Sequence, residues 1–506
     1  MDHDPALISR LRDDLGSSGY GVAGVQEALG AVASDALHRE ERLPALRATE
    51  GVDDPVAVLA RTFLLGAPVP TRSLDRALPT LGVDGARRLG LVAVDGDAAR
   101  ARVDLRPYAA VDGRGEVDWW IASDLGELAT GTALRTDHVL GVGGASTTLA
   151  QVTVRDERAL VLDLGTGCGI QALHASRHAQ RVIGTDISRR ALEFARFNAL
   201  LAGIGALELR EGSMLEPVAD ERFDLVVSNP PFVITPRTPG MPAYEYRDGG
   251  RSGDAIVREL VEGVGAVLAP GGVAQLLGNW EVRTGEQWHE RVGAWLDASG
   301  LDGWVVQREL QDPAQYAETW IRDGGTTPDR DRGAWDERYA QWLDDFASRD
   351  VEAIGFGIVT LRRPLSGISG APTMRRLEEV TGTVRQPLGP AIADSLAAHD
   401  WLAARDDAAL ADERLVVAAD VTEERYLTPG DVDPQVVLLR QGGGFGRAVQ
   451  AGTALAGFVG ACDGELTVGQ IVHALGALLD VGADAVAADI LPSARGLLRD
   501  GLLLLP

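Results

Sequence analysis

Short apolar runs alternate with stretches of helical periodicity from residue 159 to residue 278. The runs predict strands at residues 159–164, 181–186, 207–211, 223–228 and 273–278, with helices at 170–179, 189–202 and 254–268 between them. Strands that alternate with helices at this spacing pair in parallel, because each helix carries the chain back across the sheet. Residues 304–310 and 355–362 can add an edge hairpin. The pattern predicts an α/β fold around a seven-stranded sheet.

The regions on either side of this sheet have a different pattern. Because 506 residues exceed what one core supports, we expect domains at residues 1–115, 116–366 and 373–506, with a linker at 365–372. Predicted helices lie at 6–48, 56–65, 71–78 and 84–89, before a hairpin that turns at Asp95-Gly96, and at 390–402, 446–460, 467–479 (capped by Thr467 or a nearby acid) and 483–500. Both flanks, mainly helical, resemble winged helices; for the first, a helical cap without a nucleic-acid role is the alternative.

The charge of the chain limits its partners. The formal charge is -26, and all 48 basic residues are arginine. Residues 1–115 hold 14 arginines against 17 acids, and residues 373–506 hold 10 against 19. Proteins that grip nucleic acid usually present a basic face, so we expect no strong basic surface, although a local arginine patch stays open. No apolar run approaches the roughly 20 residues of a membrane span, and no signal peptide is evident.

The turn after the first predicted strand is rich in glycine. Its sequence is Asp163-Leu-Gly165-Thr166-Gly167-Cys-Gly169, in which glycine lets a ligand approach the backbone closely. The third glycine comes one residue too early for a dinucleotide fingerprint, which disfavours a nicotinamide cofactor. Asp186 ends the next strand, where a carboxylate can accept both hydroxyls of a ribose. The turn therefore predicts a nucleoside-containing cofactor.

A second motif, Asn229-Pro230-Pro231-Phe232, follows the strand at 223–228. It lies at a carboxyl end, where open α/β sheets bind ligands. The Asn229 side-chain oxygen and the Pro230 carbonyl can each accept one N–H, and the prolines hold these acceptors rigid. Phe232 can stack on a flat amide or base. The motif predicts a site for a planar NH₂ group, which it positions without a covalent intermediate.

Together these motifs resemble the Rossmann-like class I S-adenosylmethionine-dependent methyltransferases with an Asn-Pro-Pro-Phe/Tyr motif, over residues 118–362. These include release-factor glutamine and ribosomal-RNA guanine and adenine amino methyltransferases. The resemblance implies that Asp163, Gly165, Thr166 and Gly167 contact the cofactor, Asp186 its ribose and Ile187 its adenine, with Asn229 to Phe232 holding the acceptor nitrogen. Residues 248–253 resemble the glycine loop of the glutamine enzymes. The family often has an acid where Ser213 and Met214 stand, so these can supply only a weaker or backbone contact.

Several questions stay open at this stage. The charge and the glycine loop favour a protein or peptide glutamine as acceptor. The alternatives are an amino group of an RNA base, a small molecule, or a non-catalytic binding module. Residues 141–146 form a lid over the cofactor or a linker. His138 could act as a base or touch the substrate, but a position at the surface is the commoner outcome and is the one expected. Trp119, Trp120, Trp280 and Trp320 line a cleft or belong to the core.

The sequence predicts neither a metal site nor a cysteine nucleophile. Histidine and cysteine show no metal spacing, so we predict no metal. Cys168 occupies a small loop position with no histidine or acid tied to it, which disfavours a nucleophile. The chain has two cysteines, Cys168 and Cys462, and we expect a reducing cytoplasm rather than a disulfide.

Overall fold

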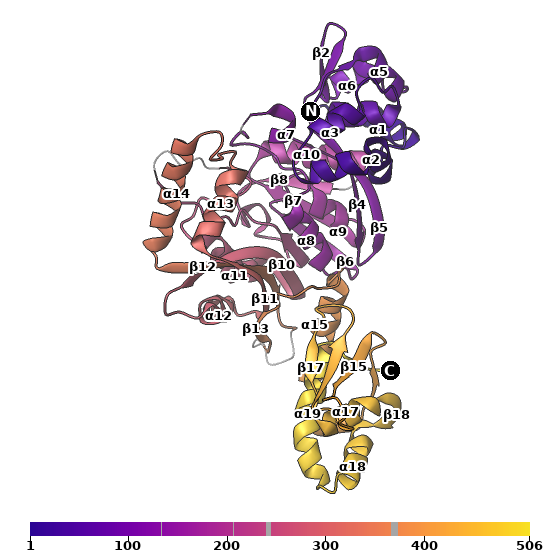
Figure 1. Ribbon diagram of the computed structural model, residues 1–506, viewed down its shortest axis with the longest axis vertical. Coiled ribbons are helices and arrows are strands. Elements are labelled where there is room, and N and C mark those ends of the chain that lie inside the picture. The colour runs from indigo at the N-terminus through magenta and orange to yellow at the C-terminus, as the bar shows by residue number, and fades with distance from the viewer. Residues whose placement is uncertain (133, 206, 239–243, 366–372) are drawn as a thin grey trace. The chain divides into compact units, whose positions relative to one another are not determined.

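The computed structural model describes residues 1–132, 134–205, 207–238, 244–365 and 373–506 (Figure 1). The chain forms two compact units. The first holds Met1–Ala150 and most of the chain to Glu379, and the second holds Gln151–Asp156 and Val380–Pro506. The predicted linker, apart from Leu365, lies outside the described residues.

An eight-stranded sheet forms the centre of the first unit. Its strands are β6 (Arg158–Leu164), β7 (Ala179–Asp186), β8 (Leu207–Glu211), β9 (Phe223–Ser228), β10 (Leu268–Arg283), β11 (Asp302–Gln311), β12 (Val351–Arg362) and β13 (Arg375–Glu379). Their order is β13-β11-β12-β10-β9-β6-β7-β8. The first seven are the predicted strands. The prediction of seven was one short, because β13 pairs in parallel with β11 and takes the edge expected for the β11–β12 hairpin.

Strands β6 to β10 pair in parallel, which brings their carboxyl ends to one edge. The elements accompanying the sheet are α8 (Gly144–Val152), α9 (Ile170–Ala175), α10 (Arg189–Leu201), η2 (Glu216–Val218), α11 (Ala255–Gly263), η3 (Val264–Val267) and α12 (Trp288–Ser299). β12 runs antiparallel to both of its neighbours, β10 and β11. The connection from β11 to β12 contains two further helices, α13 (Pro313–Asp323) and α14 (Arg332–Ala347).

The N-terminal region is helical up to residue 88 and ends in two hairpins. Its elements are α1 (Pro5–Ser17), α2 (Val22–His38), α3 (Leu43–Ala48), α4 (Pro55–Leu59), the π-helix η1 (Ala60–Leu64), β1 (Val69–Pro70), α5 (Thr71–Ala77), α6 (Gly82–Arg88), β2 (Val92–Asp95), β3 (Ala98–Ala101), β4 (Asp104–Asp112), β5 (Gly115–Ser123) and α7 (Glu127–Thr130). Asp4 caps α1, since its side chain accepts from the amides of Ala6 and Leu7. The predicted first hairpin is present as β2 and β3, with Gly96 at φ 57° in its turn.

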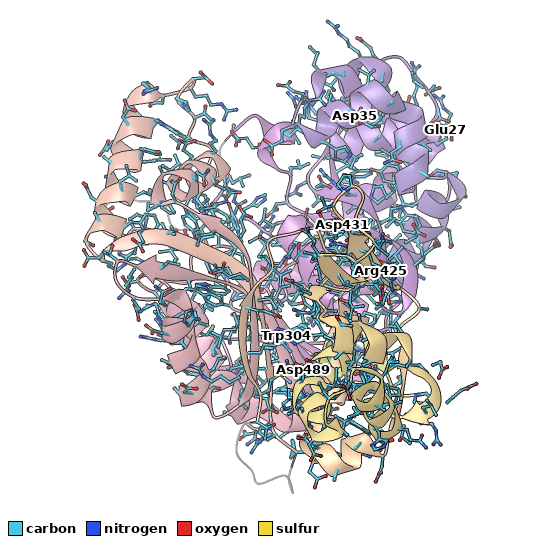
Figure 2. The ribbon with its side chains drawn as sticks, turned by 60° about the horizontal axis from the view of Figure 1, so that its bottom comes forward. Glu27, Asp35, Trp304, Arg425, Asp431 and Asp489 are labelled. Carbon is cyan, nitrogen blue, oxygen red and sulfur yellow. The ribbon has the colours of Figure 1, made fainter. Side chains whose placement is uncertain are left out.

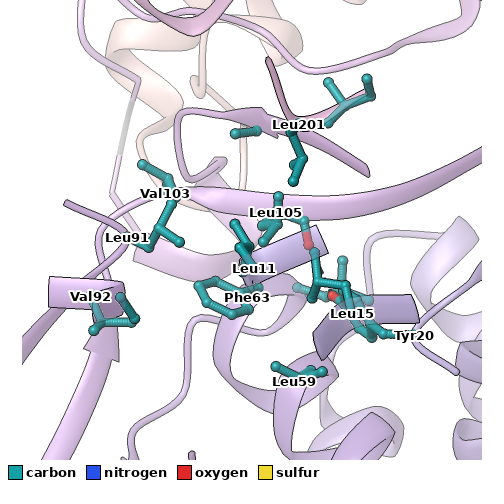
Figure 3. Packing of buried hydrophobic residues seen from close by; sticks show 14 of the residues in the cluster. Leu11, Leu15, Tyr20, Leu59, Phe63, Leu91, Val92, Val103, Leu105 and Leu201 are labelled. Atoms are coloured by element: carbon teal, nitrogen blue, oxygen red, sulfur yellow. Dashed lines mark hydrogen bonds between the residues drawn. The ribbon is translucent and has the colours of Figure 1, made fainter. Parts of the chain in front are cut away.

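The N-terminal helices share a hydrophobic core with the sheet region. Leu11, Leu15, Phe63 and Leu105 pack in one cluster with Leu201 of α10 (Figure 3). The Tyr20 hydroxyl donates to the carbonyl of Leu105 at 2.9 Å, which satisfies a polar group inside this cluster. The helical region therefore folds against α10, whose other neighbours include Gly169 of the glycine turn.

The second unit is less helical than predicted. It contains α15 (Gly389–Ala403), α16 (Asp407–Ala411), β14 (Arg414–Val417), β15 (Val421–Tyr426), β16 (Val436–Gln441), β17 (Ala448–Gln450), α17 (Thr453–Gly460), β18 (Asp463–Thr467), α18 (Val468–Leu478), α19 (Ala483–Arg499) and β19 (Leu503–Leu504). Two three-stranded sheets, β18-β14-β19 and β15-β16-β17, were not predicted. The helix expected at 446–460 begins only at Thr453, since Ala448–Gln450 pairs as a strand. Thr467 does cap α18, in a capping box with Gln470.

Acidic side chains are exposed on both units. Glu27 and Asp35 of α2 and Asp489 of α19 are exposed, as Figure 2 illustrates. The winged-helix interpretation of the flanks remains a prediction. Within the described ranges, none of the helices combines the length and the apolar character needed to cross a bilayer.

Candidate functional site

The glycine turn after β6 leaves room for a ligand. Gly165 and Gly167 have φ of 72° and 53°, in the left-handed region that favours glycine. A Cβ added at either position would meet no atom within 4 Å. A Cβ added at Gly169 would instead lie 3.1 Å from Ala195 of α10. The first two glycines therefore leave open space, whereas the third permits close packing.

Asp163 holds the turn together from inside. Its side chain is buried, and Oδ2 accepts from the Thr166 hydroxyl at 2.6 Å and from the amide of Ala172 at 2.9 Å. Burial raises the pKa of Asp163 to about 7, although these two hydrogen bonds oppose the rise. The Thr166 amide also donates to the carbonyl of Thr185 at 2.8 Å. Asp163 and Thr166 thus fix the loop through the start of α9.

Asp186 lies at the carboxyl end of β7, beside the turn. Its Oδ2 accepts from the amide of Gly167 at 2.9 Å, and its Oδ1 accepts from the amide of Ser188 at 2.8 Å. Burial raises the pKa of Asp186 despite these two bonds. Each oxygen keeps a lone pair that a hydroxyl could use. Ile187, the next residue, has a side chain that is 64% exposed, which leaves an apolar surface beside the carboxylate.

The segment after β8 completes the cofactor side. The amide of Gly212 donates to the carbonyl of Asp186 at 3.0 Å, which draws this segment onto the end of β7. Met214 has φ of 49°, a conformation uncommon for a residue with a side chain. Ser213 uses its carbonyl to accept from the amide of Glu216. The structure therefore brings Ser213 and Met214 close to Asp186.

The Asn229–Phe232 motif follows β9 at the same edge of the sheet. The Asn229 Oδ1 atom is buried and has no hydrogen-bond partner among the described residues. The Pro230 carbonyl accepts from the amide of Phe232 at 2.7 Å, so one of its two lone pairs is used within the motif. Phe232 forms an antiparallel bridge with Asp248, which joins the motif to the glycine loop. The arrangement offers an unused acceptor beside an aromatic ring.

Residues 244–248 and 136–138 meet near this motif. The amide of Glu245 donates to the carbonyl of Thr136 at 3.0 Å, and the rings of His138 and Tyr246 lie 6.1 Å apart. The expectation of a surface position for His138 was wrong, since its side chain is 6% exposed. Burial lowers the pKa of His138, which keeps the ring neutral near pH 7.

The predicted tryptophans and Cys168 lie in or against the hydrophobic core, and residues 141–146 lead into a helix. Trp280 is fully buried and stacked on Trp288 at 5.7 Å, and Trp119 and Trp120 pack on the N-terminal core. Burial raises the pKa of the Cys168 thiol to about 12, so it carries no thiolate at neutral pH. Residues 141–146 run into α8, which begins at Gly144, and the Ser146 carbonyl accepts from Gln171 Nε2. Their role as a lid stays a prediction.

Sequence reasoning missed two residues beside the motif. The Tyr316 hydroxyl on α13 accepts from the amide of Ile234 at 3.0 Å and from Asn279 Nδ2 at 2.8 Å. Tyr316 is fully buried, and Asn279 is 1% exposed. A usable signal was present, because aromatic residues at 316 and 320 stand four apart and share one face of a helix.

The geometry fits a nucleoside-containing cofactor. One edge of the sheet carries the open space beside Gly165 and Gly167, the lone pairs of Asp186 and the exposed side chain of Ile187. Asn229 Oδ1, which has no partner among the described residues, adds a buried acceptor at this edge. Within the described ranges, no set of histidine, cysteine and acidic side chains could hold a metal ion.

Parts of the chain are similar to known proteins. Residues 141–295 match the methyltransferase small domain, and residues 17–102 match a domain of unknown function (DUF7059). The ribosomal protein L11 methylase structure from Lactobacillus delbrueckii subsp. bulgaricus is 24% identical, with a TM-score of 0.24 over 32% of this chain and 72% of that chain.

Curated relatives are similar to part of the chain. The release factor glutamine methyltransferase of Moorella thermoacetica is 38% identical over 23% of this chain, which spans only 44% of that relative. The ribosomal protein uL3 glutamine methyltransferase of Bradyrhizobium diazoefficiens is 30% identical over 35% of this chain and 59% of its own length.

A longer match extends over most of another relative. The release factor glutamine methyltransferase of Deinococcus radiodurans is 31% identical over 238 residues, which make up 43% of this chain and 82% of that relative. The match covers more than two thirds of the relative. The chain belongs to the S-adenosylmethionine-dependent methyltransferases, in the family that contains the release factor glutamine methyltransferases.

Proposed function

We propose that this protein methylates the side-chain amide nitrogen of a glutamine in a protein. The observation that carries the proposal is the buried Asn229 Oδ1 atom, which has no hydrogen-bond partner within the described part of the chain. An amide N–H of the acceptor would supply that partner, and a buried acceptor left unpaired costs about 1–3 kcal/mol. The names of the relatives, which act on a release factor and on ribosomal protein uL3, support the acceptor class.

The residues of the motif would position the acceptor rather than react with it. S-adenosylmethionine supplies a methyl group on a positively charged sulfur, which leaves as a neutral thioether when the nitrogen lone pair forms the new bond. Asn229 Oδ1 and the free lone pair of the Pro230 carbonyl would accept the two N–H groups, and the ring of Phe232 would support the amide plane. This arrangement aims the nitrogen at the methyl group, which is catalysis by positioning.

The proton released from the nitrogen would pass to water. Asp248, which pairs with Phe232, is occupied, because its carboxylate accepts from the Thr235 hydroxyl and from the amide of Tyr244. A nitrogen that has gained a methyl group loses its extra proton readily, so a dedicated base is not required.

We also propose how the chain is divided into domains, which span residues 1–115, 116–366 and 373–506. The order α4–β1–α5–α6–β2–β3, with β1 and β2 both paired to β3, supports a winged helix in the first. Two buried free thiols, Cys168 and Cys462, support a reducing compartment such as the cytoplasm.

Labelled S-adenosylmethionine tests the proposed acceptor. We expect label from the methyl group to enter the protein fraction of a cell extract and to be recovered as methylated glutamine after digestion. Label in RNA or in small molecules instead would show that the methyl acceptor is not a protein glutamine. No label in any fraction, together with no cofactor binding by calorimetry, would remove the enzymatic function.

A further inference from the structure

Polar atoms without a partner in the described ranges occur on the elements that pack around the motif. Besides Asn229 Oδ1, the Asn279 Oδ1 and Trp320 Nε1 atoms are buried without a hydrogen-bond partner among the described residues. A buried indole N–H usually finds an acceptor, because leaving it unpaired costs free energy. These atoms come from β10, from α13 and from the motif itself, so they are separated in sequence.

Trp320 reaches this region through a chain of contacts. The Val233 amide, directly after the motif, donates to the carbonyl of Arg247 at 3.0 Å. The Arg247 guanidinium donates to the carbonyl of Trp320 at 2.9 Å and lies 5.9 Å from the Trp320 ring centroid. Trp320 and Phe232 also pack against the same aromatic cluster, which includes Tyr316 and Trp342. The indole therefore belongs to the wall of residues around the motif.

Tyr316 fixes this wall to the segment that follows the motif. Its hydroxyl accepts from the amide of Ile234 and from Asn279 Nδ2, and its ring lies 6.0 Å from that of Trp320. Tyr316 is fully buried, so the hydroxyl is held in one position. Trp320 stands one helical turn further along α13 on the same face.

We propose that Trp320 determines specificity by donating its indole N–H to the carbonyl oxygen of the acceptor amide. A primary amide presents N–H donors on one atom and an acceptor on the adjacent carbonyl. Asn229 Oδ1 and Trp320 Nε1 offer the complementary pair, one acceptor and one donor. Two contacts on different atoms of a planar group fix its orientation, which a single contact to the nitrogen cannot do. The inference rests on the proposed glutamine function.

The test uses N-acetylglutamine methylamide as the probe and N-acetylnorvaline methylamide, which lacks the side-chain primary amide, as its control. Nitrogen-15 labelling of the ten tryptophans gives separate indole N–H signals, and the Trp320 signal is assigned by its loss in Trp320→Phe. With S-adenosylhomocysteine present, we expect the glutamine probe to shift the Trp320 signal downfield and the norvaline probe to leave it in place.

Kinetics on the same probe supplies an independent readout. Trp320→Phe should raise the KM for the glutamine probe about five- to tenfold, the size of one hydrogen bond, and leave the KM for S-adenosylmethionine unchanged. Trp335→Phe is the matched control, because Trp335 lies in the same cluster but stacks on Tyr339 at 5.9 Å. It should leave both constants as in the wild type.

The outcomes distinguish a failure of the Trp320 contact from a failure of the proposed glutamine methylation. If the wild type methylates the probe while the Trp320 signal stays fixed and Trp320→Phe has wild-type constants, the Trp320 contact is refuted and the function stands. If neither the probe nor the protein fraction of an extract is methylated, the function fails and the Trp320 contact fails with it.

Discussion

The two halves of the site differ in how their polar atoms are partnered. On the cofactor side, Asp163 and Asp186 each accept two hydrogen bonds from the turn and the neighbouring backbone. On the acceptor side, Asn229 Oδ1 and Trp320 Nε1 are buried and have no partner among the described residues. The cofactor half is held by its own hydrogen bonds, whereas on our proposal the acceptor half gains its partners from the substrate. Two further atoms without a partner in the described ranges, Thr185 Oγ1 and Gln171 Oε1, lie outside the turn itself.

Removing the Asn229 side-chain oxygen should have the largest effect on turnover. Asn229→Ala deletes the unpartnered Oδ1 atom, so we expect kcat to fall about 10²–10³-fold, as when a group aimed at the reacting centre is lost. Cofactor affinity, measured by calorimetry, should change less than about twofold, because the turn keeps its bonds. An equal loss of turnover and of cofactor affinity would show that the two halves are not separate.

Removing a carboxylate from the other half should give the reverse pattern. Asp186→Ala breaks bonds to the amides of Gly167 and Ser188, and we expect cofactor affinity to fall about ten- to a hundredfold. Turnover at saturating cofactor should recover most of its value. Asp224→Ala is the control, because that carboxylate binds the amides of Ala159 and Leu160 at the opposite end of β6. Loss of turnover in Asp186→Ala even at saturating cofactor would contradict the assignment.

Two glycines in one turn should respond differently to the same change. Gly169→Ala places a Cβ 3.1 Å from Ala195 and at φ 90°, so we expect unfolding free energy to drop by about 1–3 kcal/mol. Gly165→Ala enters open space and should lower cofactor affinity more than Gly169→Ala does. Denaturant titration and calorimetry on both variants measure the two effects. Identical profiles would mean that the open space at Gly165 is not used by the ligand.

The smallest expected effect is a dependence of stability on pH. Burial raises the pKa of Asp163 from 3.8 to about 7 in the folded protein. Between these values the folded state binds more protons than the unfolded chain, so stability falls as pH rises. We expect the Tm of the free protein to fall by a few degrees between about pH 5 and 7. Asp163→Asn should remove this slope; a slope unchanged in that variant would assign it to another group.

The central sheet was predictable because its signals are local and repeated. Apolar runs bounded by glycine turns mark β6 to β10, and the carboxyl ends of parallel strands bring Asp163, Asp186 and Asn229 to one edge. The N-cap at Thr467 could be predicted for the same reason, because the capping residues are close in sequence. The strands that were not predicted depend on pairing with strands that are distant in sequence. β13 and β15 are short and polar, so their sequence lacks the alternation that identifies a strand.

The acceptor half resisted prediction for a different physical reason. Asn279 belongs to β10, whereas Tyr316 and Trp320 belong to α13. Only the tertiary fold brings these two elements to the motif. Burial of His138 likewise depends on residues 244–248, which lie about a hundred positions further along the chain. Sequence pattern identifies a motif, but it does not identify the side chains that complete it.

The helices α13 and α14 have a consequence for how such a site can change. They occupy the connection between β11 and β12, two adjacent antiparallel strands whose pairing brings Gln311 opposite Ile354. Both ends of the insertion therefore leave the sheet at one point, and the turn that follows β6 belongs to other strands. On the proposed role of Trp320, exchange of this insertion as one unit would alter which molecule is modified and would leave in place the residues that hold the methyl donor.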